Sequence, residues 1–175
     1  MKQNLKKILI ILLPLILQGC TLGGTKNTNK TYNIDKKIQE DWNVEYGISS
    51  DTLIQEVNID TAIEKLKEDK GILVLSSPDC QYCQTAFPLI DELSKEYQMN
   101  NIYYVDAGTI NQEKRKELNV LLNNTLKTNP DGTISLVVPD VYAITNGEVL
   151  GNQRKTLKEE DKLKNVYEDL FKKVK

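Results

Sequence analysis

The fold of this chain is decided by the stretch Gly71–Pro88, GILVLSSPDCQYCQTAFP. Its apolar run Ile72–Leu75 shows no polar alternation, which predicts a central strand covered on both faces. A turn follows, and Cys80-Gln-Tyr-Cys83 then opens a helical pattern that extends to about residue 98. A strand that delivers a Cys-x-x-Cys pair to the start of a helix indicates a redox-active dithiol.

The position of each cysteine predicts its role. A thiolate at a helix N-terminus is stabilised by the positive end of the helix dipole and by free backbone N–H groups. Cys80 lies further out along that end and is the predicted nucleophile. Cys83 lies one turn in and is expected to attack the mixed disulfide that forms. A structural disulfide is the alternative, although so small a loop would add little stability. A zinc site needs four ligands, whereas the chain offers this pair of thiols and no histidine.

The helix after the cysteines contains Pro88, five residues after Cys83. Strand, Cys-x-x-Cys, helix and a proline at this distance resemble thioredoxin. The predicted order β-α-β-α-β-α-β-β-α over residues 53–173 is similar to the same family. The resemblance implies an α/β thioredoxin fold, with a central mixed sheet of four to five strands flanked by helices.

A second proline carries the resemblance further. Pro139 follows two valines and precedes a predicted strand, an Asn146-Gly147 hairpin turn and another strand. By residue type alone, Pro139 only interrupts a strand, and a trans loop proline without a role is the alternative. The resemblance implies that Val138–Pro139 is cis and that the Val138 backbone pairs with an extended substrate segment beside Cys80. Gln81 and Tyr82, between the cysteines, are further candidates for substrate binding.

The strands and helices around the dithiol follow from apolar spacing. An edge strand is predicted at Leu53–Val57 and another strand at Asn101–Asp106. Between the edge strand and Gly71, apolar residues recur at helical spacing, with Asn58 or Asp60 as the cap.

The second half of the chain is predicted to add two more helices. The first spans about Asn111–Leu126, with Thr109 and Gln112 forming a capping box. Asn129–Gly132 is a strong turn signal. The last helix follows a capping-box pattern that begins at Thr156 and carries apolar residues at helical spacing.

Two departures from thioredoxin bear on function. The segment around 117–133 is longer than a minimal thioredoxin needs and is expected to shape partner recognition. The position six residues before the first cysteine, where thioredoxin has a buried acid, is Val74 here. The usual internal proton acceptor is therefore missing, and Asp79 is the acid closest to Cys80 in the sequence.

The N-terminus reads as an export signal. Three lysines precede a ten-residue apolar run that is too short to span a bilayer but suits a signal-peptide core. The following Leu17-Gln-Gly-Cys20 resembles a bacterial lipobox, although Gln18 is larger than the residue usually found there. The resemblance implies cleavage before Cys20 and lipidation of its sulfur, with palmitate among the acyl chains. A membrane-anchor helix or an uncleaved signal with a chance cysteine is the alternative.

The chain therefore divides into four predicted segments. A signal peptide occupies 1–19, the lipidated cysteine and a Gly-, Thr-, Asn- and Lys-rich tether 20–31, an N-terminal extension 32–52 and the thioredoxin-like domain 53–175. In the extension we expect a helix at Ile34–Glu40 and a strand at Val44–Ile48. Trp42, the only tryptophan, is interpreted as a packing residue rather than a binding platform.

Composition excludes several classes of function. The 175 residues suffice for one domain. Residues 1–19 carry three of the 23 basic residues and no acid, so the remainder has 20 basic against 25 acidic residues. This acidic body argues against nucleic acid as a partner. The absence of histidine excludes an imidazole base and disfavours a transition metal, so neither cofactor nor metal is expected.

These observations predict a thiol–disulfide oxidoreductase that acts on protein disulfides from the extracytoplasmic face of a bacterial cell membrane. The reductase direction is favoured, because Gln81-Tyr82 contains no cation or histidine to stabilise a thiolate. A membrane electron donor is then needed as a partner. A thiol peroxidase on the same fold is an alternative that the distance in sequence of Arg115 and Arg154 from the cysteines disfavours. A non-catalytic binding module is the other.

Overall fold

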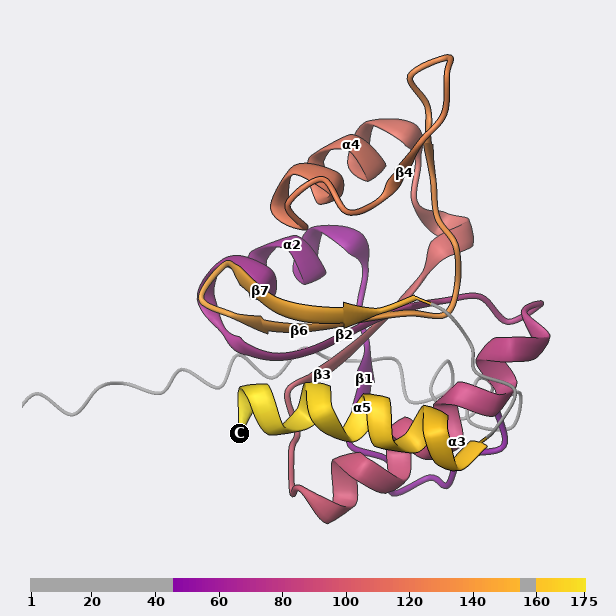
Figure 1. Cartoon of the computed structure of the whole chain (residues 1–175), viewed down its shortest axis with the longest axis vertical. Helices are drawn as coiled ribbons and strands as arrows, with labels where there is room; N and C mark the ends of the chain where they lie inside the picture. The colour runs from indigo at the N-terminus through magenta and orange to yellow at the C-terminus, as the bar shows by residue number, and fades with distance from the viewer. Residues whose placement is uncertain (1–45, 155–159) are drawn as a thin grey trace, which may run out of the picture. The chain divides into compact units, whose positions relative to one another are not determined.

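The computed structural model describes residues 46–154 and 160–175 (Figure 1). All of them belong to one compact unit. The expected signal peptide, Cys20, the Ile34–Glu40 helix and Trp42 lie outside the described residues. Among the residues that are described, no helix combines the length and the apolar character needed to cross a bilayer.

A five-stranded mixed sheet forms the centre of the unit, in the order β1-β3-β2-β6-β7. The strands are β1 (Ile54–Glu56), β2 (Lys70–Ser76), β3 (Ile102–Asp106), β6 (Asp140–Thr145) and β7 (Glu148–Gln153). β1 and β2 pair in parallel with β3, whereas β6 is antiparallel to β2 and to β7. The central strand β2 is buried from Gly71 to Ser76, as its apolar run predicted.

Helices cover both faces of this sheet. They are α2 (Ile59–Glu68), α3 (Gln81–Glu96), α4 (Gln112–Leu121) and α5 (Glu160–Val174). Because side chains alternate along a strand, Ile72 and Val74 of β2 pack with α3 and α5. Leu73 and Leu75 pack toward α2 and α4. Figure 1 shows α2 above the sheet and α3 and α5 below it. This is the predicted thioredoxin fold.

The helix starts follow from local capping, with one correction. Asn58 caps α2 by accepting from Thr61 N at 2.9 Å, as expected. The predicted Thr109 cap is wrong, because Asn111 caps α4 by accepting from Lys114 N at 2.9 Å. Thr109 instead ends the short 3₁₀ helix η1 (Ala107–Thr109).

The segment after α4 differs from the prediction. α4 ends at Leu121 rather than near Leu126, since Asn123 and Asn124 adopt left-handed conformations that no α-helix continues. A two-stranded ribbon follows, made of β4 (Lys127–Thr128) and β5 (Ile134–Ser135). Its tip, which projects away from the sheet in Figure 1, is the predicted Asn129–Gly132 turn, closed by Gly132 N donating to Asn129 O at 2.9 Å. We call residues 117–133, the segment expected to be longer than in thioredoxin, the insertion.

The predicted strand at Val44–Ile48 is wrong for residues 46–48, which form no strand. Tyr46 is buried because its ring stacks on Phe87 of α3, with centroids 4.0 Å apart. Alternating apolar residues in this segment therefore reflect packing against a helix and not a place in the sheet.

The hairpin predicted at Asn146-Gly147 is confirmed. Both residues have positive φ, at 48° and 80°, and they connect β6 to β7.

Candidate active site

The two cysteines lie at the junction between β2 and α3. β2 ends at Ser76, and the turn closes when Cys80 N donates to Ser77 O at 3.0 Å. Cys80 has an extended backbone and is the N-cap of α3. Its sulfur accepts a hydrogen bond from the backbone N–H of Cys83 at 3.2 Å. The sulfur of Cys80 thus occupies the place at a helix N-terminus where a thiolate is stabilised.

The thiols are free and differ in accessibility. Cys83 is completely buried, whereas Cys80 is half-buried. Burial, with a further contribution from the Cys80 thiol, raises the pKa of Cys83 to about 12, although the Ser76 hydroxyl and the Ser77 backbone act in the opposite direction. Cys83 is therefore protonated at neutral pH and shielded from solvent. Of the two cysteines, Cys80 is therefore the more accessible one.

The loop before β6 closes the site from the other side. The Val138–Pro139 peptide bond is cis, as the resemblance implies. The carbonyl of Val138 accepts a hydrogen bond from the Cys80 thiol, with sulfur and oxygen 3.6 Å apart. The structure therefore brings Cys80, Cys83, Val138 and Pro139 together although 58 residues separate Cys80 from Val138.

The remaining predicted site residues lie at the rim. Gln81 and Tyr82 are exposed in the first turn of α3, and Tyr82 has 60% of its surface accessible. Val137, next to the cis-proline loop, is also an exposed apolar residue. Asp79 is exposed to solvent. Tyr82 and Val137 are thus the exposed large apolar side chains of the segments that carry Cys80 and Val138.

Val74, at the position where thioredoxin has a buried acid, is packed among apolar side chains, and several hydroxyl groups lie nearby. Val74 is fully buried and pairs with Tyr104 of β3. Nearer the dithiol, the hydroxyl of Tyr46 lies 3.3 Å from those of both Ser76 and Tyr104. Burial and the Tyr46 hydroxyl raise the pKa of Tyr104 far above its usual range. The interior beside Cys83 therefore contains the hydroxyl of Ser76, which the Tyr46 hydroxyl contacts in turn.

A buried polar cluster behind the cis-proline was not predicted. It centres on Asp140, which is fully buried and directly follows Pro139. Arg154 pairs with Asp140, its Nε lying 2.7 Å from the carboxylate. An acidic residue at the start of an otherwise apolar strand was the available sequence signal. Its partner could not be read from spacing, since Arg154 lies on the next strand's far end.

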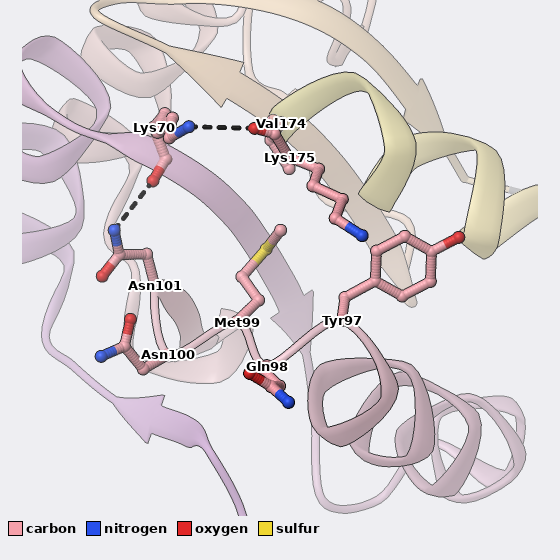
Figure 2. A pocket seen from close by; sticks show the side chains of 8 residues that line it. All are labelled: Lys70, Tyr97, Gln98, Met99, Asn100, Asn101, Val174 and Lys175. Carbon is pink, nitrogen blue, oxygen red and sulfur yellow. Dashed lines mark hydrogen bonds between the residues drawn. The ribbon is translucent and has the colours of Figure 1, made fainter.

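The described residues contain no cluster of three or more side chains suited to hold a metal ion. A hollow lies near the start of β2, at the other end of that strand from the dithiol (Figure 2). Its two lysines are engaged within the chain. Lys70 Nζ donates to Lys175 O at 3.0 Å, and Lys175 Nζ lies 5.1 Å from the centroid of the Tyr97 ring. This hollow is separate from the candidate active site.

Comparisons with known proteins give one family match and several structural neighbours. The family model described as TraF, F plasmid transfer operon protein, matches residues 26–139. No curated protein matches the chain. Among solved structures, the reduced thioredoxin pre-protein of Schistosoma mansoni has a TM-score of 0.45 and 22% identity, covering 70% of this chain and 98% of that one. The thioredoxin of Trypanosoma brucei brucei has a TM-score of 0.47 and 16% identity, with coverages of 68% and 91%.

Proposed function

The chain belongs to the TraF family of F plasmid transfer operon proteins, and we propose that within it this protein is a thiol–disulfide oxidoreductase acting on protein disulfides. One observation carries the proposal. The half-buried sulfur of Cys80 caps α3 and touches the Val138 carbonyl, while its partner Cys83 is held buried and protonated one turn below.

The chemistry proceeds in two exchanges. The Cys80 thiolate attacks one sulfur of the substrate disulfide, so that a Cys80–substrate disulfide forms and the other substrate sulfur leaves as a thiolate. Cys83 then loses its proton and attacks the sulfur of Cys80. This forms the Cys80–Cys83 disulfide and releases the second substrate sulfur as a thiolate. Two electrons have passed from the dithiol to the substrate, whose two thiolates take up protons.

The cis-proline loop is the proposed docking site for the substrate backbone. An extended peptide that pairs with Val138 places its disulfide next to Cys80, because Val138 O lies 3.6 Å from that sulfur. Tyr82 and Val137 offer apolar surface to the side chains of such a peptide. Gln81 adds a polar contact at the same rim.

We further propose that the protein works as a reductase at the extracytoplasmic face of a bacterial membrane, anchored through a lipid on Cys20. The reductase direction follows from Gln81-Tyr82, which carries no charge that would favour the thiolate. An exported reductase needs a membrane dithiol protein as its electron donor. Replacing Cys20 by Ser should move the protein from the membrane to the soluble fraction, and retention of the variant on the membrane would contradict the lipid anchor.

The mechanism is tested by removing each thiol separately. Cys80→Ser keeps a side-chain oxygen at the N-cap and should abolish reduction of insulin disulfides. Cys83→Ser should accumulate a mixed disulfide at Cys80, visible by non-reducing electrophoresis and mass spectrometry. Unchanged turnover in Cys80→Ser would exclude the catalytic function and leave a binding module.

The direction is tested by the reduction potential of the dithiol against glutathione. A value near −270 mV, as in thioredoxin, supports a reductase, and a value near −120 mV supports an oxidase.

The alternative function, a thiol peroxidase, is disfavoured by the contacts of the two arginines. Arg115 donates to the carbonyls of Ala107, Ile110 and Ile134, and Arg154 pairs with Asp140, so both guanidinium groups are engaged by partners other than Cys80.

A further inference from the structure

An ion pair lies directly behind the cis-proline loop. Asp140 follows Pro139 in the chain, begins β6 and has no exposed surface. Arg154, just after the end of β7, donates from Nε to Asp140 Oδ2 at 2.7 Å. The pair therefore joins the end of one sheet strand to the residue covalently bonded to the cis-proline.

Two further side chains donate hydrogen bonds to the Asp140 carboxylate. The hydroxyl of Tyr142 donates to Oδ2 at 2.6 Å, and Asn152 Nδ2 donates to Oδ1 at 3.3 Å. Tyr142 and Asn152 face each other across the β6–β7 ladder. Both carboxylate oxygens are thus held from fixed positions on the sheet, which restricts where residue 140 can lie.

Arg154 also reaches the insertion. One terminal nitrogen donates to the carbonyl of Thr125 at 2.6 Å, and the other donates to the Tyr142 hydroxyl at 2.8 Å. Thr125 lies between α4 and β4, and its own hydroxyl lies 3.3 Å from that of Tyr142. A single guanidinium therefore fastens the insertion, the hairpin β6–β7 and the start of β6 to one another.

Burying the charged groups of Asp140 and Arg154 costs desolvation free energy. Burial raises the pKa of Asp140, and the hydrogen bonds from Tyr142 and Arg154 oppose that effect. Apolar side chains of the same volume often serve stability as well as a buried ion pair does. The ion pair instead fixes the relative orientation of Asp140 and Arg154, because a guanidinium and a carboxylate form strong hydrogen bonds in only a few relative orientations.

The orientation of Asp140 affects the position of the residues next to it in the chain and in the sheet. Asp140 pairs with Leu75 of β2, the strand that leads to Cys80. Two residues before Asp140, the Val138 carbonyl contacts the Cys80 sulfur. A shift of residue 140 is therefore transmitted through Pro139 to the backbone that faces the dithiol.

We propose that Arg154 is a positioning residue: through Asp140 it holds the Val138–Pro139 backbone where an extended, disulfide-containing peptide pairs beside Cys80. The proposal rests on the proposed oxidoreductase function. It assigns to Arg154 a role in the recognition of protein substrates and none in the transfer of electrons.

The test compares Arg154→Gln with the wild-type protein on two disulfides. Insulin must dock against the loop, whereas 5,5′-dithiobis(2-nitrobenzoate) needs only access to Cys80. The variant should raise KM for insulin about tenfold, and change the rate with the small disulfide less than about threefold. Equal losses with both disulfides, or no loss with insulin, would overturn the positioning role.

Arg115→Gln is the matched control, because Arg115 is a second arginine that holds backbone, through three carbonyls, and none of these lies at the cis-proline loop. It should leave the ratio of the two rates unchanged. If Arg154→Gln does not fold, Asp140→Asn combined with Arg154→Gln gives the same comparison without an unpaired buried charge.

Amide hydrogen exchange separates this proposal from the proposed function. In Arg154→Gln, exchange at Val138 and Val141 should become faster while exchange in α3 stays as in the wild type. Unchanged exchange at these amides would refute the positioning role whatever the activity. A wild-type protein that reduces neither disulfide would instead refute the oxidoreductase function.

Discussion

Cys80 and Cys83 lie one helical turn apart, yet Cys83 is completely buried and Cys80 only half-buried. Alkylation by iodoacetamide requires an accessible thiolate. Because burial raises the pKa of Cys83 to about 12, Cys80 should be modified at least ~10 times faster at pH 8, as measured by mass spectrometry of the derived peptides. In Cys80→Ser, Cys83 should stay unreactive until the solution is strongly alkaline. Similar rates for the two cysteines would contradict the assigned roles.

Glu56 on the edge strand β1 is a second residue whose charge is unfavourable in the folded protein. Its Oε2 is buried without a hydrogen-bond partner among the described residues. Burial, and then the charge of Asp106, raise the pKa of Glu56 above 4.5. The native state therefore holds this proton more tightly than the unfolded chain does, and stability is lost as the pH rises above 4.5.

Glu56→Gln removes that charge. The variant should have a Tm ~1–3 °C above wild type at pH 7, and the difference should vanish below pH ~4. Thermal unfolding followed by circular dichroism at both pH values measures it. Glu148→Gln, on an exposed position of β7, is the control and should change Tm at neither pH. A lower Tm for Glu56→Gln at pH 7 would mean that the carboxylate is stabilised after all.

At the scale of elements, the start of β2 depends on a close backbone approach. A Cβ on Gly71 would lie 2.1 Å from the carbonyl oxygen of Asn101, which cannot move without breaking the β2–β3 pairing. Gly71→Ala should therefore cost about 2–4 kcal/mol in the free energy of unfolding, measured by urea denaturation.

Gly132→Ala provides the comparison for Gly71→Ala. Gly132 has a positive φ of 78° but open space around it, so only backbone strain opposes a methyl group there. Its cost should be about 1 kcal/mol. Equal costs at the two positions would show that the contact with Asn101 is relieved by a small shift.

The elements that the sequence predicts best are those set by local signals. The Cys-x-x-Cys turn, the Asn146-Gly147 hairpin and the Asn58 cap depend on residues within a few positions of one another. The end of α4 was misjudged because the apolar spacing continues to Leu126, whereas two asparagines turn the backbone before it. The β4–β5 ribbon has strands of two residues, too short for any periodicity.

At the scale of the whole molecule, the core includes residues that precede the predicted domain start at 53. Tyr46 and Ile48 are buried in the cluster that α3 and α5 form with the sheet. Tyr46 stacks on Phe87 and meets Tyr104 edge to face, with centroids 5.7 Å apart. The C-terminal part of the 32–52 extension thus completes the face of the sheet that carries the dithiol helix.

Substitutions at Tyr46 measure that contribution. Tyr46→Ala should lower the free energy of unfolding by about 3–5 kcal/mol, because it leaves a cavity against Phe87. Tyr46→Phe keeps the ring and removes the hydroxyl, with its hydrogen bonds to Ser76 and Tyr104, so it should cost about 1 kcal/mol. A Tyr46→Ala variant as stable as Tyr46→Phe would mean that the extension is dispensable to the fold.

The sequence predicts only part of the candidate site, because some of its residues lie far apart in the chain. The dithiol lies within four residues, and the resemblance to thioredoxin supplied Val138 and Pro139. The cluster around Asp140 required three distant parts of the chain, since Arg154 binds both Asp140 and Thr125. Sequence spacing carries no information on which buried acid meets which arginine until the sheet is assembled.

The N-cap of α3 has a consequence for observing the protein at work. The atom that accepts the N–H of Cys83 is the same sulfur that would change its bonding in each step of the proposed thiol–disulfide exchange. A thiolate is a stronger acceptor than a sulfur committed to a disulfide. The amide proton of Cys83 is thus a built-in spectroscopic reporter: its nuclear magnetic resonance frequency should shift between the reduced, mixed-disulfide and oxidised forms, so that the redox cycle can be followed without any added probe.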